Sequence, residues 1–273
     1  MARHPLSVRD SKRPPDEPYE GVPAHLTHPL LHWLEGVFSY RGDHGLDGHL
    51  MRSVASYVRI PLKHASQSKM IMEQILAACE HDDIFLDVID ACLAKSHNAR
   101  QVSKVLEEIL VNAGSVWTVA PDGRSLQRRV DDSATKAFQS AAKPGAIGSS
   151  ELVEAWAACF GRQPNPSDAW DHAIKAVEAV LIPVVVPNQD KAQLGHVLGQ
   201  LKDHGDQWKF LLAAQQNSTP IGTLVGMLQL MWPNPDRHGG TGSRVPTLPE
   251  AQAVVHLAIT IVQWVRNEVL SKR

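Results

Sequence analysis

The chain has 273 residues, of which 43% are hydrophobic and 21% charged, and its formal net charge is −2 at pH 7. This apolar content is enough for a sizeable core in one large or two small domains. The nearly balanced charge excludes indiscriminate nucleic-acid binding, which requires a strongly basic surface, so any contact with RNA must be local.

Residues 1–21 carry basic side chains with no apolar segment behind them, which is typical neither of a secretory signal nor of a membrane anchor. We expect a flexible tail here, and no membrane partner, because every longer apolar stretch is interrupted by polar residues or proline. The three cysteines, Cys79, Cys92 and Cys159, lack metal-ligand spacing and occupy apolar helical positions. They indicate reduced core thiols and a cytoplasmic protein.

Residues 22–112 show the periodicity of helices that bury one apolar face. No repeat period links the stripes, and together they predict an N-terminal helical domain. The stripes are Leu30, Leu34, Val37 and Phe38; Leu50, Val54 and Val58; Ile71, Ile75 and Cys79; Phe85, Val88, Ile89 and Cys92; and Val102, Leu106, Ile109 and Leu110.

Residues 113–150 are predicted to form a hairpin and linker region. Ser115–Val119 and Arg124–Arg129 flank a turn, Ala120-Pro121-Asp122-Gly123, which is typical of a small β-hairpin. The arginines of its second half are interpreted as a solvated edge. A helix is expected from Ser133 to Ala142, and the glycine- and serine-rich stretch Ala141–Ser150 marks a second boundary.

Residues 151–273 predict a bundle of capped helices, which makes the whole chain all-α apart from the hairpin near residues 115–129. Asn165–Asp168 is typical of a helix start, and the stripe that follows it is expected to end at Pro183. A later stripe stops at Trp232-Pro233, and Thr247–Glu250 forms a capping box before the last one. The stripes run from Trp170 to Leu181, Leu194 to Leu201, Ile221 to Met231 and Ala251 to Val265.

The loop before the last helix contains the run Asp236-Arg237-His238-Gly239-Gly240. Arg237 keeps its charge at cellular pH and can hold a phosphate through two parallel hydrogen bonds. His238 titrates near neutrality and can move the proton of a 2′-hydroxyl. Gly239 lets backbone approach a phosphate closely, although a simple turn explains it equally well. From residue types alone, a catalytic loop and an ordinary solvated loop both stay open.

Four features of the C-terminal half together resemble the HEPN domains found at the C-termini of bacterial abortive infection proteins. They are the Ala-Trp-Asp-His-Ala-Ile-Lys-Ala-Val-Glu stretch Ala169–Glu178, the pair Leu194-Gly195, the Arg237-His238-Gly239 loop and the Ala-rich closing helix. The resemblance covers Glu151 to Arg273. It implies a helical bundle that pairs as a homodimer and cuts RNA, for example tRNA, with an arginine and a histidine near the dimer cleft.

The resemblance implies a metal-independent endoribonuclease toxin of antiphage or stress defence, held inactive until a phage-derived or protein trigger reaches the N-terminal domain. His238 is then the general base or acid, and Arg237 stabilises charge on the phosphorus. Lys175 and Glu178 share one side of a helix and could support the site, or they form a solvated pair. Arg244 could add a phosphate contact, or it is an ordinary exposed arginine.

Two other classes of function stay open. A non-catalytic HEPN-like module that binds RNA, nucleotide or protein is favoured by the adjacency of Arg237 and His238, because the family motif separates these residue types. A plain helical interaction or scaffold protein is the third class. We expect no cofactor and no metal, because a phosphate-binding Gly-Lys loop is missing and the local histidine set, His25, His28 and His32, has no carboxylate placed beside it.

Overall fold

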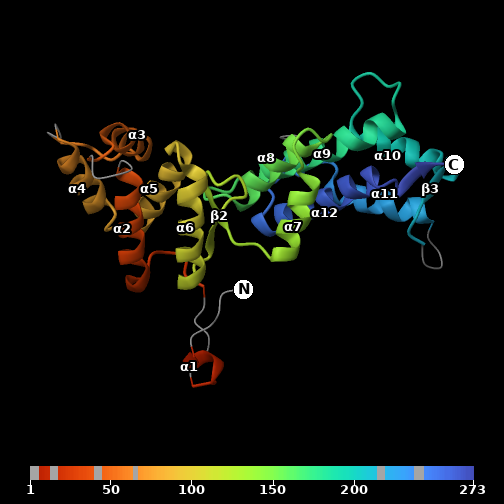
Figure 1. The fold of residues 1–273 in the computed structure, drawn as a ribbon. Helices are drawn as coiled ribbons and strands as arrows, with labels where there is room; N and C mark the ends of the chain where they lie inside the picture. The colour runs from red at the N-terminus through yellow and green to blue at the C-terminus, as the bar shows by residue number, and fades with distance from the viewer. Residues whose placement is uncertain (1–5, 13–17, 40–44, 64–66, 214–218, 237–242) are drawn as a thin grey trace. The chain divides into compact units, whose positions relative to one another are not determined.

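The computed structural model describes residues 6–12, 18–39, 45–63, 67–213, 219–236 and 243–273. These residues are mostly helical, and their strands form two small antiparallel pairs (Figure 1). The predicted all-α fold with a small hairpin is therefore confirmed. The chain divides into two compact units, Met1–Arg129 and Val130–Arg273, and each has its own apolar core.

The first unit packs its helices around the stripes expected from the sequence, so that Leu30, Val54 and Ile75 are each 0% exposed. Cys79 and Cys92 are buried in this core as free thiols, as predicted. Desolvation by burial raises the pKa of Cys79 to about 12, which keeps this thiol protonated at neutral pH. The helices are α1 (Leu6–Arg9), α2 (Ala24–Phe38), α3 (Gly48–Val58), α4 (Ser68–Ala78), α5 (Asp82–Lys95) and α6 (Ala99–Ala113).

Residues 18–21 were expected to belong to a flexible tail, but they are held against the hairpin. Tyr19 bridges Ser115 in parallel, and the Trp117 indole N–H donates to the Glu20 carbonyl at 2.8 Å. Both carboxylate oxygens of Glu20 accept hydrogen bonds from Arg128, at 3.0 and 2.7 Å. Arg128 is therefore ion-paired at a solvated edge of the hairpin, where its side chain is 39% exposed.

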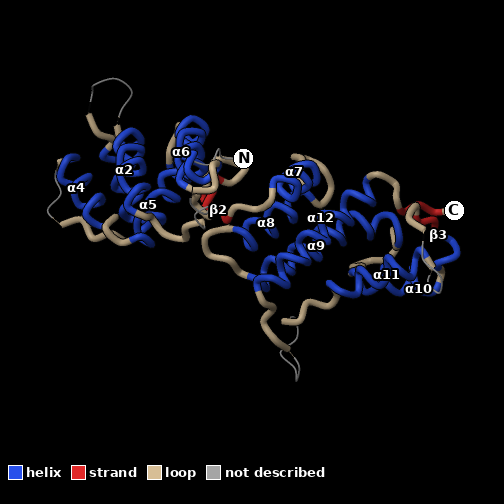
Figure 2. The backbone as a smooth tube through the Cα atoms, turned by 90° about the horizontal axis from the view of Figure 1, so that it is seen from below, coloured by secondary structure: helices blue, strands red, loops and turns tan. Residues whose placement is uncertain are grey.

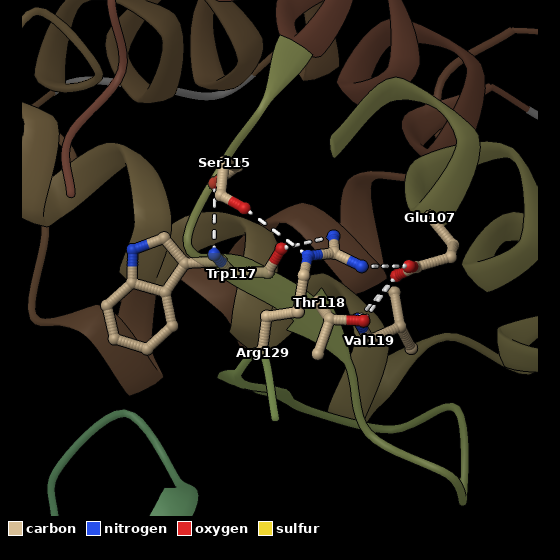
Figure 3. Close-up of polar contacts among 6 residues, drawn as sticks. All are labelled: Glu107, Ser115, Trp117, Thr118, Val119 and Arg129. Atoms are coloured by element: carbon tan, nitrogen blue, oxygen red, sulfur yellow. Dashed lines mark hydrogen bonds and ion pairs between the residues drawn. The ribbon is translucent and has the colours of Figure 1, made fainter. Parts of the chain in front are cut away.

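The hairpin consists of β1 (Trp117–Val119) and β2 (Leu126–Arg128), and Glu107 of α6 holds it in place. One carboxylate oxygen of Glu107 accepts from the Thr118 hydroxyl and the Val119 N–H, both at 2.8 Å. Its other oxygen accepts from the Arg129 guanidinium at 3.1 Å, as Figure 3 shows. Arg129 also donates to the Trp117 carbonyl at 3.0 Å. These bonds tie the hairpin to the first unit.

The second unit is built around α9 and α12, which lie side by side, with α8 packed against both (Figure 2). Its apolar core includes Trp156, Leu181 and Val262, with 2%, 0% and 0% exposed. Cys159 is also buried here as a free thiol. The elements are α7 (Asp132–Ala141), α8 (Ser149–Phe160), α9 (Pro166–Val185), α10 (Leu194–Asp203), the 3-10 helix η1 (Gly205–Gln207), β3 (Trp208–Phe210), α11 (Pro220–Met231), α12 (Leu248–Arg266) and β4 (Leu270–Lys272).

Three features of the second unit differ from the sequence expectations. The expected linker 113–150 is split, because the hairpin lies in the first unit while α7 packs on α8 and α12. Helix α9 continues past Pro183 to Val185. Pro183 costs one backbone hydrogen bond, but burial of Val185 in the core, where it is 5% exposed, stabilises the last turn. The antiparallel pair of β3 with β4 was not expected, because strands of three residues carry too few positions for an alternating pattern.

Helix α12 alone among the described helices has the length and composition of a membrane span. Val255, Ala258 and Val262 along its length are 0% exposed, and it packs against α8 and α9. The same apolar composition therefore serves the core of the second unit.

We expect Glu107→Gln to lower the free energy of unfolding by about 1–2 kcal/mol, because the ion pair with Arg129 and one hydrogen-bond acceptor for the hairpin are lost. Urea denaturation followed by circular dichroism measures the change. The control is Glu108→Gln, which alters the neighbouring exposed carboxylate and should shift stability by less than about 0.5 kcal/mol. Equal stability of the two variants would contradict the role given to Glu107.

Candidate functional site

The Arg237-His238-Gly239 loop lies outside the described residues, but both of its ends are described. The backbone N–H of Arg244 donates to the Pro235 carbonyl at 3.2 Å, so the chain leaves and returns at one point. The base of this loop is therefore closed by a backbone hydrogen bond. We call residues 234–236 the stem of the loop.

The stem is fixed on the first turns of α9 by Asn234, whose side chain is buried. Its amide nitrogen donates to the Asp171 carboxylate at 2.8 Å and to the Ser167 carbonyl at 3.2 Å. Its amide oxygen accepts from the Asp236 N–H at 3.0 Å. The Ser167 hydroxyl also donates to the Asp236 carboxylate at 2.7 Å. Three of these hydrogen bonds connect the stem to α9, and the fourth joins Asn234 to Asp236 within the stem.

The end of α11, which leads into the stem, is held by the same helix. The Trp170 indole N–H donates to the Met231 carbonyl at 2.7 Å in a buried position. Gly195 of α10 packs closely against Trp232, the residue after Met231. A Cβ atom at Gly195 would lie 3.1 Å from the Trp232 indole nitrogen. The Ala169–Glu178 stretch, the Leu194-Gly195 pair and the approach to the Arg237 loop therefore pack as one assembly.

Glu178 and Lys175, expected to support the site, have different environments. The Glu178 carboxylate accepts from the Leu194 N–H at 2.7 Å and so caps the first turn of α10. Lys175 is exposed on α9. The described contacts of Glu178 are those of a helix cap, while the ammonium of Lys175 is open to solvent.

Arg244 is committed to an ion pair at the start of α12. Its guanidinium donates to both carboxylate oxygens of Glu250, at 2.8 and 2.6 Å. Glu250 also accepts from the N–H and the hydroxyl of Thr247, which completes the predicted capping box. These contacts hold the pKa of Glu250 down at about 2, with the Arg244 hydrogen bond as the largest cause. Arg244 therefore anchors the returning end of the loop.

A histidine that the sequence analysis did not single out lies on α9 between two carboxylates. His172 follows Asp171 on α9, and its Nδ1 lies 2.6 Å from a carboxylate oxygen of Glu151 on α8. Its Nε2 lies 3.6 Å from an Asp168 oxygen, and the side chain is 21% exposed. The Asp168-to-His172 spacing of one helical turn was visible in the sequence, but nothing in it linked Glu151 to either residue. A carboxylate at Nδ1 orients an imidazole for proton transfer.

The described side chains around the loop are better suited to orienting an imidazole for proton exchange than to attracting an anion. Asp168, Asp171 and Asp236 make the base of the loop acidic, and the described residues contain no group of three or more side chains suited to a metal ion. These acidic residues lower the attraction of the base of the loop for a phosphate.

We expect Asn234→Ala to loosen the stem, because it leaves the Asp236 N–H and the Asp171 carboxylate without their partner, at a cost of about 1–3 kcal/mol. Hydrogen exchange should then be faster at the amides of Asp236 and Arg244, while the core of α12 stays protected. The matched control is Asn188→Ala, which removes an exposed amide from the same unit. Unchanged exchange at the stem in Asn234→Ala would refute its anchoring role.

The Glu250 carboxylate should titrate near pH 2 in the folded protein, well below the ordinary 4.5. Because the folded pKa is depressed, the stabilising contribution is fully present above the unfolded pKa and disappears as pH falls through the folded one. Carbon-detected NMR titration of the carboxyl group measures this midpoint. Arg244→Gln should move it upward, towards the ordinary value, whereas an unmoved midpoint would show that Thr247 alone sets it.

Comparison with family models, with curated proteins and with solved structures finds no match to this chain. Three features of the described residues bear on function: a loop closed at its base, a stem that Asn234 fixes on α9, and the oriented imidazole of His172 on the same helix.

Proposed function

We propose that the second unit is a metal-independent endoribonuclease of the HEPN type, with Arg237 and His238 as its catalytic residues. The observation that carries the proposal is the attachment of the stem to α9 through Asn234. This contact joins the two segments on which the HEPN resemblance rests, Ala169–Glu178 and the Arg237-His238 loop. A loop fixed at its base on a rigid helix is the usual setting of catalytic side chains.

RNA supplies its own nucleophile, so the reaction needs few groups from the protein. His238 takes the proton of the 2′-hydroxyl, the oxygen bonds to the adjacent phosphorus, and the bond from phosphorus to the 5′-oxygen breaks. The leaving oxygen takes up a proton, from a protonated imidazole or from water. Arg237 donates to the non-bridging oxygens, where charge develops in the transition state. The products end in a 2′,3′-cyclic phosphate and a 5′-hydroxyl.

The biological setting follows from the same resemblance. A homodimer brings two copies of the loop together and so supplies two histidines, one for each proton transfer. The substrate is an exposed RNA segment such as a tRNA loop, in keeping with the net charge of −2, which disfavours wrapping of long nucleic acid. The protein then acts in the cytoplasm in antiphage or stress defence, with the first unit receiving the trigger.

A non-catalytic HEPN-like binding module is the second candidate. It is favoured by the adjacency of Arg237 and His238 in the sequence. The acidic residues Asp168, Asp171 and Asp236 at the base of the loop lower the affinity for a polyanion, so for this module they favour a protein partner over RNA.

The purified protein in excess chelator should cut total RNA or tRNA to fragments that end in a 2′,3′-cyclic phosphate. His238→Ala and Arg237→Ala should each lower the cleavage rate by about 100-fold or more, as expected for loss of a proton carrier or of a charge-stabilising donor. The matched control is His204→Ala, which removes an exposed histidine of the same unit and should cut like the parent. Fragment ends are read by sequencing after selective ligation.

The same RNA readout in cells, before and after phage challenge, supplies a trigger that purified protein lacks. Cleavage that appears in the parent and the His204→Ala control, but not in His238→Ala, supports the enzyme. RNA that stays intact in vitro and in challenged cells, while the protein still binds it, contradicts the enzyme and favours the binding module.

A further inference from the structure

A cavity of about 510 Å³ lies in the first unit, between α6 and the β1–β2 hairpin. One wall is the first half of α6, from Ala99 to Glu107, and the other is the hairpin from Val119 to Arg124. This volume is in the range of pockets that hold small molecules. All of the lining residues are described, and all belong to the first unit.

The two walls are fixed relative to each other. Glu107 of α6 accepts hydrogen bonds from Thr118, Val119 and Arg129, as Figure 3 shows. On the other strand, the Leu126 N–H donates to the Asp90 carboxylate at 2.6 Å. Hydrogen bonds to α5 and α6 therefore fix the hairpin in place beside α6.

The hairpin turn also requires glycine at its closest approach to α6. Gly123 has φ of +75°, in the left-handed region that favours glycine, and a Cβ atom there would lie 3.3 Å from the Ser103 hydroxyl oxygen. Ser103 is buried and donates to the Arg100 carbonyl. A small residue at this position lets the turn form the floor of the cavity.

Three cations line the cavity from both walls. Arg100 and Lys104 lie one turn apart on α6, and Arg124 extends from the hairpin turn. No acidic partner for Arg100 or Lys104 occurs among the described residues, and the Arg124 guanidinium reaches the Ala94 carbonyl at 3.4 Å. Like charges at this helical spacing repel each other, and a bound anion relieves that repulsion.

The two carboxylates of the lining are already engaged. Glu107 is neutralised by Arg129, which lies outside the lining. The Asp122 carboxylate accepts from the Arg124 N–H at 2.9 Å, in a local turn contact. The charge that the cavity offers to a ligand is therefore positive.

We propose that this cavity binds a nucleotide, with its phosphates held by Arg100, Lys104 and Arg124. A single inorganic phosphate is too small for a cavity of this volume, and part of the wall is apolar, formed by Val119 and its neighbours Ala120 and Pro121. The base or sugar packs against this apolar edge. Three cations suit a diphosphate or triphosphate, because each can donate charge-assisted hydrogen bonds to a different oxygen. The binding is independent of any activity of the second unit.

Titration calorimetry of the full-length protein tests the site with ADP, GDP and UDP, and with pyrophosphate and adenosine as partial probes. At least one nucleotide should bind saturably and more tightly than pyrophosphate, and adenosine should not bind. Lys104→Gln should weaken the nucleotide about tenfold, through loss of one charge-assisted hydrogen bond. Arg124→Gln should act in the same direction from the opposite wall.

The matched control is Lys69→Gln, which removes an exposed lysine from α4 of the same unit, outside the cavity. Thermal melting shows that each variant is folded, and the control should keep the parental affinity. Three results overturn the proposal: no saturable binding of any nucleotide, equal loss in Lys104→Gln and Lys69→Gln, or pyrophosphate binding as tightly as every nucleotide.

Discussion

Both units depend on one kind of interaction. A carboxylate on a helix accepts a hydrogen bond from a backbone N–H of another segment, either a strand of the hairpin or the start of another helix. Glu107 accepts from Val119, Asp90 from Leu126 and Glu178 from Leu194. A backbone N–H withdrawn from water without a partner costs about as much as a lost hydrogen bond, so each junction in these units requires such an acceptor. The acceptors therefore decide where hairpin and helix starts attach to the helical cores.

This constraint also gives both candidate sites their rigidity. The cavity of the first unit keeps its width because Glu107 and Asp90 hold the hairpin from two different helices. In the second unit the direction is reversed: Asn234 is a loop residue, and its amide nitrogen donates to Asp171 of α9 while its amide oxygen accepts from the Asp236 N–H.

The helices could be predicted from the sequence because their signal is local: an apolar stripe and a cap, such as Thr247 with Glu250, lie within a few residues. The acceptors could not, because Glu107 and Val119 or Glu178 and Leu194 are linked only once the chain is folded. For the same reason His172 was visible inside the Ala169–Glu178 stretch, but its partner Glu151 on α8 was not. Residues 130–150 could not be assigned to a unit from the sequence, because the amphipathic pattern of α7 fits either core equally.

The two candidate sites differ in charge: the stem of the loop is acidic, whereas cations line the cavity of the first unit. In the second unit the acidic stem repels a polyanion, but at physiological ionic strength that repulsion is screened over about 8 Å. A phosphate contact made by the loop must therefore be short and directional, which suits the planar, bidentate guanidinium of Arg237 better than a lysine. In the first unit Arg100 and Lys104 form no ion pair among the described residues, and the cations of the lining outnumber its carboxylates, Glu107 and Asp122. Charge alone thus favours the cavity for small anions, while the RNA contact proposed for the loop would have to depend on geometry.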